Sequence, residues 1–212
     1  MKTYGILCFV LALFMILTPL LSLDYSSFSL SNVKSTFQKE NDSKDEEKLL
    51  DEKSDSVKIK SAASGNVATA STKEYIIGCV AAEMPATYST EALKAQAVCA
   101  YTNLVRLKKN PDSSLSGADI SDDPGRHQGY YDTETQKEKW GDKYDEYRAK
   151  TEEAVNDFLG KTLVFNGEPI VAAYCAISPG RTESAENIWG GKIDYLVSVT
   201  SPGDKLSPDC IK

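Results

Sequence analysis

The stretch KEYIIGCVAAEMP, residues 73–85, decides the fold of this chain. Ile76, Val80 and Glu83 recur at i, i+4 and i+7, which predicts a helix with these three side chains on one face. Pro85 ends the predicted helix, because the residue before a proline is displaced from the helical region of backbone conformation. The pattern therefore places Glu83 in the last turn of a helix over residues 73–84.

The position of Glu83 has a chemical consequence. The C-terminal end of a helix carries partial negative charge, which disfavours an ionised carboxylate. Partial burial against an apolar face acts in the same direction. A carboxyl group that stays protonated near neutral pH is suited to act as a general acid, so Glu83 is a candidate catalytic residue. The alternative is an ordinary carboxylate on a helix surface.

A second helix is expected over residues 91–108, starting after Ser89 or Thr90 and closed by the Asn110-Pro111 pair. Its apolar residues recur at spacings of four and three, which is typical of a stripe that faces the core. The stripe consists of Leu93, Ala97, Ala100, Leu104 and Leu107.

A third helical pattern covers residues 140–159, and Gly160 fits the position just beyond a helix C-terminus. Between the second and third patterns, residues 112–131 are rich in Ser, Asp, Gly and Pro and are expected to form a loop. That loop contains His127, the single histidine of the chain.

Strands are expected in the last part of the chain. The Asn166-Gly167 pair predicts a tight turn between strands at 162–165 and 169–177, and residues 195–199 have the composition of another strand. Trp189 and Tyr195 are expected to lie in the core. The predicted class is α+β, with helices packed on a mostly antiparallel sheet in one compact domain over residues 73–212.

The amino-terminal segment has the properties of a membrane anchor. Residues 5–23 contain no charged residue, and a transmembrane helix needs about 20 apolar residues. Lys2 before this run and Asp24 after it predict a cytoplasmic N-terminus and an extracytoplasmic domain. We therefore expect residues 1–23 to form an uncleaved, single-pass signal anchor in the cell membrane; the alternative is a cleaved signal peptide, although no A-x-A cleavage pattern is present.

Residues 24–72 are expected to be a flexible, disordered linker. Their middle part, residues 39–60, is a run of mixed charges, and residues 61–71 are small and polar. Such a composition buries too little apolar surface to offset the conformational entropy of the chain.

Composition excludes some classes of partner. The net charge of −7 argues against nucleic acid, because phosphate binding depends on clustered Lys and Arg. No cysteine pair has the spacing of a zinc site, so we expect no metal and no other cofactor. Cys79 and Cys99 lie among apolar neighbours and are expected to be buried free thiols.

Two blocks of the sequence resemble the stage II sporulation protein D family. The first is residues 74–85 followed by EALKAQAV at 91–98, and the second is residues 170–199 with a Ser-x-Gly-x-Thr-Glu loop at 178–183. A Gln-x-Tyr, at residues 128–130, lies between them. The resemblance covers about residues 73–204.

The resemblance implies a lytic transglycosylase. Such an enzyme cleaves the bond between N-acetylmuramic acid and N-acetylglucosamine in peptidoglycan, and this family acts on glycan strands stripped of stem peptides. Glu83 matches the single acid/base glutamate of the family. The implied setting is engulfment of the forespore, with a cell-wall amidase and other engulfment membrane proteins as partners.

The resemblance also implies a set of substrate-binding residues, which in this chain are Lys94, Gln96, Gln128, Tyr130, Ser178, Arg181, Thr182 and Glu183. The structural alternative for the first two is a place among exposed helix residues. For residues 178–183 it is an ordinary polar turn, in which Arg181 and Glu183 form a weak surface ion pair.

Two positions depart from the family pattern. Where members typically read A-R-T-Y, this chain reads Ala100-Tyr101-Thr102-Asn103, so a cation that would hold a polar group of the sugar is missing. The departure motivates an alternative function, a non-catalytic module that binds the cell wall or activates an amidase.

Overall fold

The structure is a computed structural model that describes residues 56–206. Its central element is α3 (Thr72–Glu83), whose N-terminus is capped by the Ser71 hydroxyl, which accepts a hydrogen bond of 3.2 Å from the Glu74 amide. Every residue from Tyr75 to Ala81 is buried, because α3 has neighbours on all sides. The predicted helix is confirmed, and its burial extends well beyond the one expected face.

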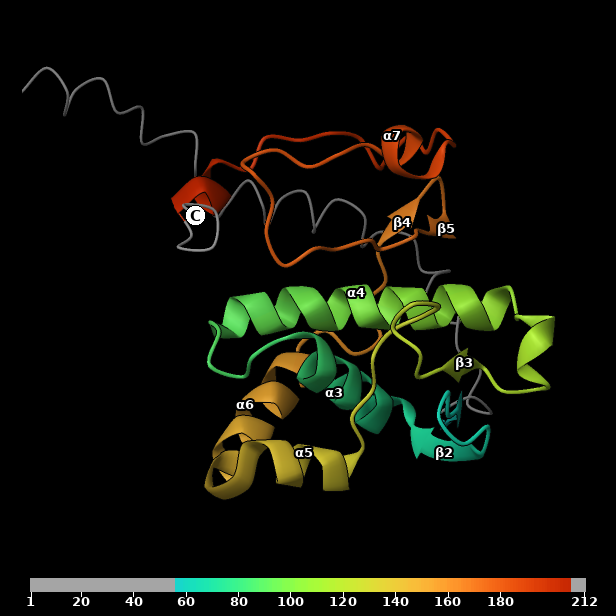
Figure 1. Ribbon diagram of the computed structural model, residues 1–212, viewed down its shortest axis with the longest axis vertical. Coiled ribbons are helices and arrows are strands. Elements are labelled where there is room, and N and C mark those ends of the chain that lie inside the picture. Colours follow the sequence, from blue (N-terminus) through green and yellow to red (C-terminus); the bar gives the residue numbers. More distant parts are fainter. Residues whose placement is uncertain (1–55, 207–212) are drawn as a thin grey trace, which may run out of the picture. The chain divides into compact units, whose positions relative to one another are not determined.

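Helix α4 (Thr90–Lys109) is the longest element described and contacts both α3 and α6 (Tyr144–Asn156). Ser89 caps its N-terminus, and the predicted stripe is confirmed, since four of its members are buried and Leu107 is partly buried against them. In Figure 1, α4 crosses the view between two groups of elements. On one side lie α3, α5 (Thr133–Trp140) and α6, and on the other lie β4 (Val164–Phe165), β5 (Glu168–Pro169) and α7 (Ala185–Trp189).

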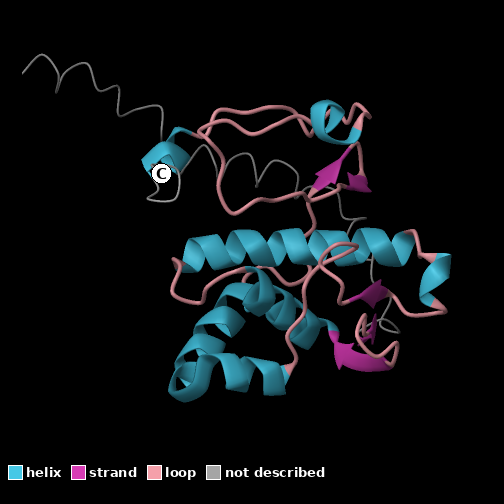
Figure 2. Cartoon of the chain, viewed as in Figure 1, coloured by secondary structure: helices cyan, strands magenta, loops and turns pink. Residues whose placement is uncertain are grey.

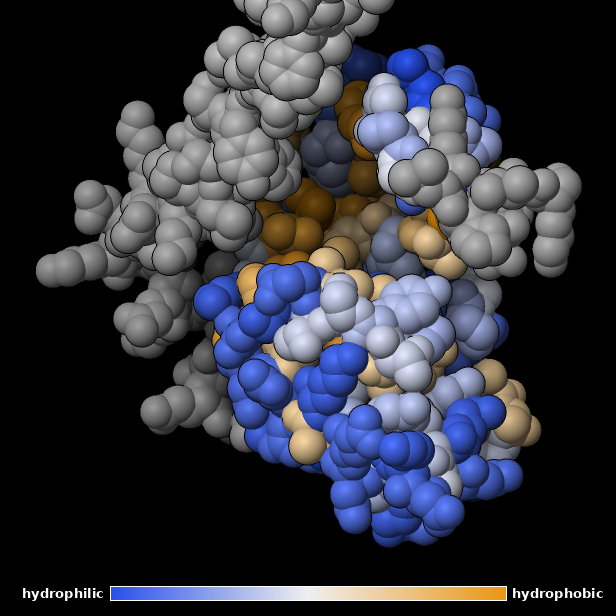
Figure 3. Space-filling model, turned by 90° about the vertical axis from the view of Figure 1, so that its left-hand side faces the viewer, coloured by the Kyte–Doolittle hydropathy of each residue, from blue (hydrophilic) through white to orange (hydrophobic). Residues whose placement is uncertain are grey.

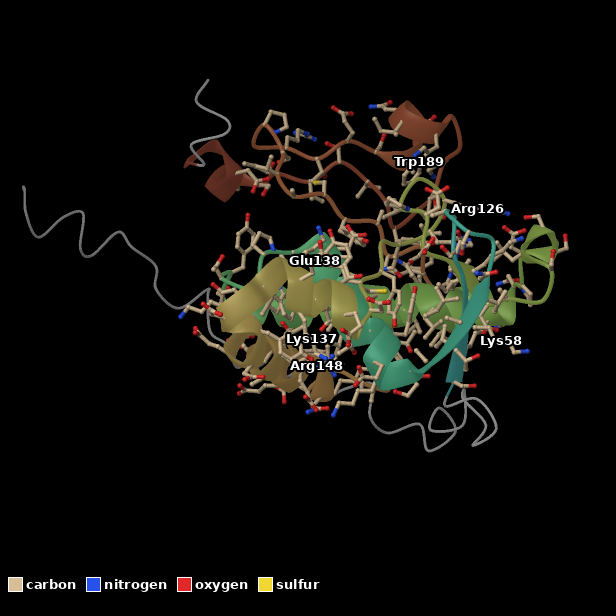
Figure 4. All side chains as sticks on the ribbon, turned by 60° about the horizontal axis from the view of Figure 1, so that its bottom comes forward. Lys58, Arg126, Lys137, Glu138, Arg148 and Trp189 are labelled. Atoms are coloured by element: carbon tan, nitrogen blue, oxygen red, sulfur yellow. The ribbon has the colours of Figure 1, made fainter. Side chains whose placement is uncertain are left out.

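The third predicted helix, at residues 140–159, is shorter in the structure and is preceded by a helix that was not predicted. Helix α5 (Thr133–Trp140) starts at the Asp132 cap, and α6 (Tyr144–Asn156) follows a short 3-10 turn, η3 (Gly141–Lys143). Figure 2 shows these helices as neighbours of α3. An ion pair of 2.6 Å between Arg148, labelled in Figure 4, and Glu74 links α6 to α3.

The sheet that packs beside α3 is small and mixed. Its order is β2-β1-β3, in which β1 (Ser56–Lys60) pairs antiparallel with β2 (Val67–Ser71) and parallel with β3 (Ile120–Ser121). The expected linker therefore does not extend to residue 72, because residues 56–71 form a hairpin of the folded domain. Alternate residues of β1, Val57 and Ile59, enter the core and hold this hairpin in place.

The predicted hairpin around Asn166 and Gly167 is confirmed at its turn, but its strands are shorter than expected. Strands β4 (Val164–Phe165) and β5 (Glu168–Pro169) pair antiparallel across Asn166 and Gly167, both of which have positive φ, at 52° and 77°. The predicted strand at 169–177 stops at Pro169. The expected helix end at Gly160 is wrong, because the helix ends at Asn156, and Gly160, with a φ of 85°, lies in the turn that follows.

The last described segment holds mostly irregular structure. It contains α7 (Ala185–Trp189) and the 3-10 turn η4 (Pro202–Leu206), and a further 3-10 turn, η2 (Ser113–Leu115), lies earlier in the chain. The predicted strand at 195–199 is absent; a single bridge between Arg181 and Thr200 takes its place. Trp189 is 60% exposed, so its expected place in the core is wrong.

The core lies mainly between helices, with 16 buried residues contributed by α3, α4, α6, β1 and β3. The α+β class is confirmed, but the helices pack chiefly on one another and the sheet is mixed, because one of its two pairings is parallel. Within residues 56–206, no helix is long and apolar enough to cross a membrane. The predicted anchor, residues 1–23, lies outside the described residues.

Candidate active site

Glu83 lies in the last turn of α3, as predicted; it is the final residue of the helix and is partly exposed. Its Oε1 accepts a hydrogen bond of 2.9 Å from the Gly129 amide, which holds the carboxyl group at the helix end. Among the described residues, no hydrogen-bond donor contacts its second oxygen. The carboxyl group is therefore fixed through one oxygen and has the other available for proton exchange.

The surroundings of Glu83 carry little competing charge. One and two turns earlier in α3 lie Cys79 and Tyr75, and burial raises the pKa of the Cys79 thiol to about 12 and that of Tyr75 well above its usual value. The charge of Glu83 adds to both shifts. Both groups are therefore neutral at physiological pH, and the carboxyl group lies beside uncharged neighbours.

A tyrosine from the C-terminal part completes this cluster. The pKa of Tyr174 is raised to about 12, chiefly by burial and also by the Glu83 charge, while the side chains of Gln128 and Gln96 act in the opposite direction. The Tyr174 hydroxyl is 3.5 Å from Gln128 Nε2. The structure thus brings Glu83, two of the predicted glutamines and Tyr174 together from separate stretches of chain.

Residues 128–131, here called the strap, lie closely against α3. The close packing occurs at two glycines, Gly78 in α3 and Gly129 in the strap. Tyr130 stacks on Tyr75 with ring centroids 5.7 Å apart. A Cβ added at Gly78 would lie 2.4 Å from the Tyr130 ring, and the Tyr131 amide donates to the Gly78 carbonyl at 3.1 Å. The absence of a side chain at residue 78 therefore lets the strap lie directly on α3, with Gly129 against Glu83.

Comparison with known proteins agrees with the sequence pattern. The chain matches the profile of the family described as "Stage II sporulation protein" over residues 60–165. It is 41% identical to stage II sporulation protein D of Bacillus subtilis (strain 168) over 154 residues, 72% of this chain and 45% of that protein.

The chain belongs to the stage II sporulation protein D family. The corresponding protein of Bacillus amyloliquefaciens is 39% identical over 79% of this chain and 49% of its own length. The chain thus spans about half the length of these curated relatives. A more distant relative, the "Amidase enhancer" of Bacillus subtilis (strain 168), is 29% identical over 57% of this chain and 14% of its own length.

Not all residues implied by the family resemblance lie in the Glu83 cluster. Gln96, Gln128 and Tyr130 do, whereas the Lys94 ammonium binds the carboxylates of Asp157, at 2.8 Å, and Glu91, at 3.0 Å. Lys94 thus joins α4 to the end of α6 in this structure.

The Ser-x-Gly-x-Thr-Glu loop of the family is bonded to the segment that follows it. The Ser178 amide donates to Asp204 at 2.9 Å, the Arg181 guanidinium donates to the Ser198 hydroxyl at 2.7 Å, and Thr182 and Val199 exchange hydrogen bonds. Glu183 accepts from the Asn187 side chain at 3.0 Å. The ion pair between Arg181 and Glu183, which the polar-turn alternative included, is absent among the ion pairs of residues 56–206. The loop is folded against residues 198–204, and its role in binding substrate remains a prediction.

The two departures from the family pattern occupy different environments. Tyr101 is 5% exposed and belongs to the core cluster. The Asn103 side chain makes two hydrogen bonds of 3.0 Å with the backbone of Ala172, donating to its carbonyl and accepting from its amide. Asn103 therefore fixes the segment that presents Tyr174, two residues further on.

Tyr174 and Gly129 belong to the cluster but were not among the residues predicted from the sequence. Gly129 has a local signal, since it is the middle residue of the Gln-x-Tyr motif. Tyr174 has none, because its placement depends on the contact between Asn103 and Ala172, 69 residues apart.

His127 acts within its loop. Its Nδ1 accepts a hydrogen bond of 2.9 Å from the Ser121 amide, and burial lowers its pKa from 6.5. Among residues 56–206 no group of three or more His, Cys, Asp or Glu side chains is arranged to hold a metal ion. Cys79 is buried and Cys99 is partly buried, and both are free thiols.

Replacement of His127 by Asn is expected to weaken the pH dependence of stability. Because the folded-state pKa of His127 is depressed, its contribution to the free energy of unfolding is complete above pH 6.5 and is lost as the pH falls below that value. The asparagine side chain of the variant would keep an acceptor for the Ser121 amide but cannot titrate. Urea unfolding at pH values about one unit above and one unit below 6.5 should show a smaller stability loss in the variant than in the wild type; equal losses would contradict this assignment.

Replacement of Gly129 by Ala is expected to reduce activity more than stability. The added Cβ would lie 3.2 Å from both Ala82 Cβ and Glu83 Oε1, so the carboxyl group must shift by a few tenths of an ångström. Overpacking of this kind costs about 1 kcal/mol or more, and small displacements of a reacting group reduce rates, so we expect a loss of roughly tenfold or more in any Glu83-dependent reaction.

The chain offers a matched control for Gly129. The Gly125 amide also donates to a carboxylate at 2.9 Å, and a Cβ at Gly125 would lie 3.2 Å from that oxygen, on Asp123. Gly125→Ala therefore introduces the same crowding away from Glu83 and should leave the reaction rate unchanged. Equal rate losses in the two variants, measured at equal folded fraction, would show that the Gly129 contact has no special role.

Proposed function

We propose that this domain is a peptidoglycan lytic transglycosylase that cleaves the bond between N-acetylmuramic acid and N-acetylglucosamine, with Glu83 as its single general acid and base. The observation that carries the proposal is the Glu83 carboxyl group at the end of a buried helix, held by the Gly129 amide through one oxygen. Membership of a sporulation family with a cell-wall setting supports the choice of substrate.

The proposed reaction uses the free oxygen of Glu83 twice. The protonated carboxyl group donates its proton to the glycosidic oxygen as the bond from the muramoyl C1 breaks. The muramoyl C6 hydroxyl then attacks C1 and gives its proton to the Glu83 carboxylate, so that a 1,6-anhydro ring forms and the acid is restored. Because the substrate supplies the nucleophile, the reaction needs one carboxylate, unlike the two-carboxylate scheme of most glycosidases.

The proposed biological setting is cell-wall remodelling in sporulation. Glycan strands without stem peptides are the proposed substrate, and a cell-wall amidase that removes those peptides, with other engulfment membrane proteins, is the proposed partner set. We also propose that residues 1–23 anchor the chain in the cell membrane with the domain outside, on the sequence evidence of an apolar run after Lys2.

A second candidate function is a non-catalytic module that binds glycan or activates an amidase. One observation favours it: Tyr101 lies in the core at a position where family members typically have a cation. The distant relative named "Amidase enhancer" is compatible with the same idea.

The two functions are separated by a digest of glycan strands without stem peptides. The full chain, solubilised in detergent, and its Glu83→Ala variant would be incubated with the strands, and the products would be analysed by mass spectrometry. Anhydromuramoyl ends from the wild type only would support the transglycosylase. Intact strands that co-sediment with both folded proteins, or stimulation of an amidase without cleavage, would support the second function instead.

A further inference from the structure

Arg181 is an exposed cation without an anionic partner. Its guanidinium donates through Nε to the Ser198 hydroxyl at 2.7 Å. Within residues 56–206, no carboxylate forms an ion pair with Arg181, and its two terminal nitrogens have no hydrogen-bond partner. Glu183, the acidic residue two positions further on, accepts instead from Asn187. The N–H groups of the terminal nitrogens are therefore available to a ligand.

The lack of an anionic partner is informative because the chain is acidic, with 31 Asp and Glu against 24 Lys and Arg. Arg126 and Arg148 each form an ion pair with a carboxylate. Arg106 has no carboxylate partner among the described residues, but it lies in the last turn of α4, where the negative end of the helix stabilises a cation. No such feature explains Arg181, which lies in an extended segment.

The backbone and Ser198 together hold the Arg181 side chain in place. Arg181 and Thr200 form an antiparallel bridge, so that Ser198 is the diagonal neighbour of Arg181 on the same face of the two paired segments. The Ser198 hydroxyl accepts from Arg181 Nε and donates to the Thr182 carbonyl. Directly opposite Arg181, the Thr200 hydroxyl has no hydrogen-bond partner within the described part of the chain. One face of this pair of segments thus presents a guanidinium and a hydroxyl, both with free donors.

A guanidinium with free terminal nitrogens is suited to bind a carboxylate through two parallel hydrogen bonds. The proposed substrate carries such a group. Each muramic acid has a lactyl carboxyl group on its C3 oxygen, which is amide-linked in strands with stem peptides and is a free carboxylate in strands without them. The carboxylate is therefore the charged group that distinguishes the proposed substrate from glycan that still carries its peptides.

We propose that Arg181, with Thr200, binds the lactyl carboxylate of a muramic acid and thereby selects glycan strands from which the stem peptides have been removed. This inference rests on the proposed function and adds the group by which the substrate is selected. Because the carboxylate recurs in every disaccharide, the muramic acid at Arg181 need not be the one whose bond breaks.

The shape of the molecule leaves room for a strand between the two groups of residues. Figure 3 shows apolar residues gathered in a hollow between the helical part and the C-terminal segments, on one face of the molecule. Glu83 belongs to the helical part and Arg181 to the C-terminal segments. A glycan strand that lies along this hollow would contact both parts, with the C–H faces of its sugar rings against the apolar residues.

The test compares glycan strands without stem peptides, whose carboxylates are free, with the same strands after coupling of the carboxylates to methylamine. The coupling removes the charge and leaves the sugars unchanged. Hydrogen bonds to a charged group are worth a factor of roughly 10 to 100, and exposure places Arg181 at the lower end. The full wild-type chain, in detergent, should therefore cleave the free-carboxylate strands about tenfold faster than the coupled strands. Added salt should reduce this preference, because exposed charges are screened.

Three variants separate the Arg181 contact from a general effect of charge. Arg181→Gln should cleave the two preparations at similar rates, whereas Arg181→Lys keeps the charge without the planar fork and should retain part of the preference. Arg106→Gln is the matched control, since it removes the same charge from an arginine that also lacks a carboxylate partner, and it should retain the full preference. Melting temperatures measured beside the rates establish that the compared proteins are equally folded.

The inference and the proposed function fail in different ways. Equal or slower cleavage of the free-carboxylate strands by the wild type, an unchanged preference in Arg181→Gln, or an equal loss in Arg106→Gln would overturn the inference and leave the transglycosylase standing. If the folded wild type cleaves neither preparation, the proposed function fails, and co-sedimentation with the two preparations decides the inference. Tighter binding to free-carboxylate strands that is lost in Arg181→Gln would support it. Equal binding to both preparations, or binding to neither, would overturn it.

Discussion

Replacement of Glu83 by Gln is expected to reduce glycan cleavage by roughly 10³-fold or more. General acid–base catalysis by one group contributes about 10²- to 10⁴-fold, and in the proposed reaction the same carboxyl group serves both proton transfers. The glutamine side chain of the variant would still present an oxygen to the Gly129 amide, so the contact that positions the side chain is preserved. The rate of release of soluble fragments from glycan strands, measured beside the melting temperature, checks the prediction.

The control for this variant lies on the same helix. Glu74 pairs with Arg148 at 2.6 Å, and Arg148 is well covered, so Glu74→Gln should destabilise the domain without loss of cleavage at equal folded fraction. Glu83→Gln should show the opposite combination, in which the rate of glycan cleavage falls and the stability of the domain is retained. Comparable cleavage by Glu83→Gln and the wild type would remove Glu83 from the mechanism.

Replacement of Gly78 by Ala is expected to lower the free energy of unfolding by about 3 kcal/mol or more. Alanine normally stabilises a helix relative to glycine by roughly 0.5–1 kcal/mol, so an ordinary helical position would give the opposite sign. Here the added Cβ would lie 2.4 Å from the Tyr130 ring and 2.5 Å from the Tyr131 carbonyl oxygen. Since that oxygen belongs to the backbone, the clash can be removed only if the strap moves away from α3. The expected loss of stability is therefore at the upper end of the range for overpacked cores.

Chemical denaturation of Gly78→Ala measures this cost directly. A loss of about 3 kcal/mol corresponds to a melting temperature lower by roughly 6–12 °C for a domain of this size. Gly191→Ala is the control, because a Cβ there meets no atom within 4 Å, and its stability should stay within about 0.5 kcal/mol of the wild type. An unchanged or raised stability of Gly78→Ala would show that the strap does not lie on α3 as described.

The helices were predictable because residues close in the sequence determine where they begin and end. Ser89 caps α4, and Pro85 follows the end of α3. The expected stripes of α3 and α4 were also correct in outline. The periodicity of the sequence did not show that α3 is buried on nearly all sides. This burial arises because several other elements pack against α3.

The strands were harder to predict because few of their residues are buried. In β1 only Val57 and Ile59 enter the core, and lysines beside them give the segment the composition of a linker. Residues 195–199 have the opposite property: Val197 and Val199 favour a strand, yet both are exposed and no partner strand is present within residues 56–206. Strand formation depends on a pairing partner, which sequence composition does not supply.

The candidate site was predictable only in part. Glu83, Gln96 and Gln128 came from motifs and lie together in the structure. Tyr174 is brought to them by Asn103, a residue that in the sequence is notable only as a departure from the family. The hydrogen bonds between Asn103 and Ala172 show that this departure has a structural use, which a residue-by-residue comparison with the family does not reveal.

The source of the oxygen in the products distinguishes transglycosylation by Glu83 from hydrolysis. Glycan strands without stem peptides would be digested by the wild-type chain in water enriched in heavy oxygen, and the new ends would be analysed by mass spectrometry. Transglycosylation by Glu83 should give anhydromuramoyl ends without heavy oxygen, because the C6 hydroxyl of the substrate is the nucleophile. Reducing ends that carry heavy oxygen would contradict it, since a hydrolase would then be at work, and the absence of any new ends from the folded protein would contradict catalysis altogether.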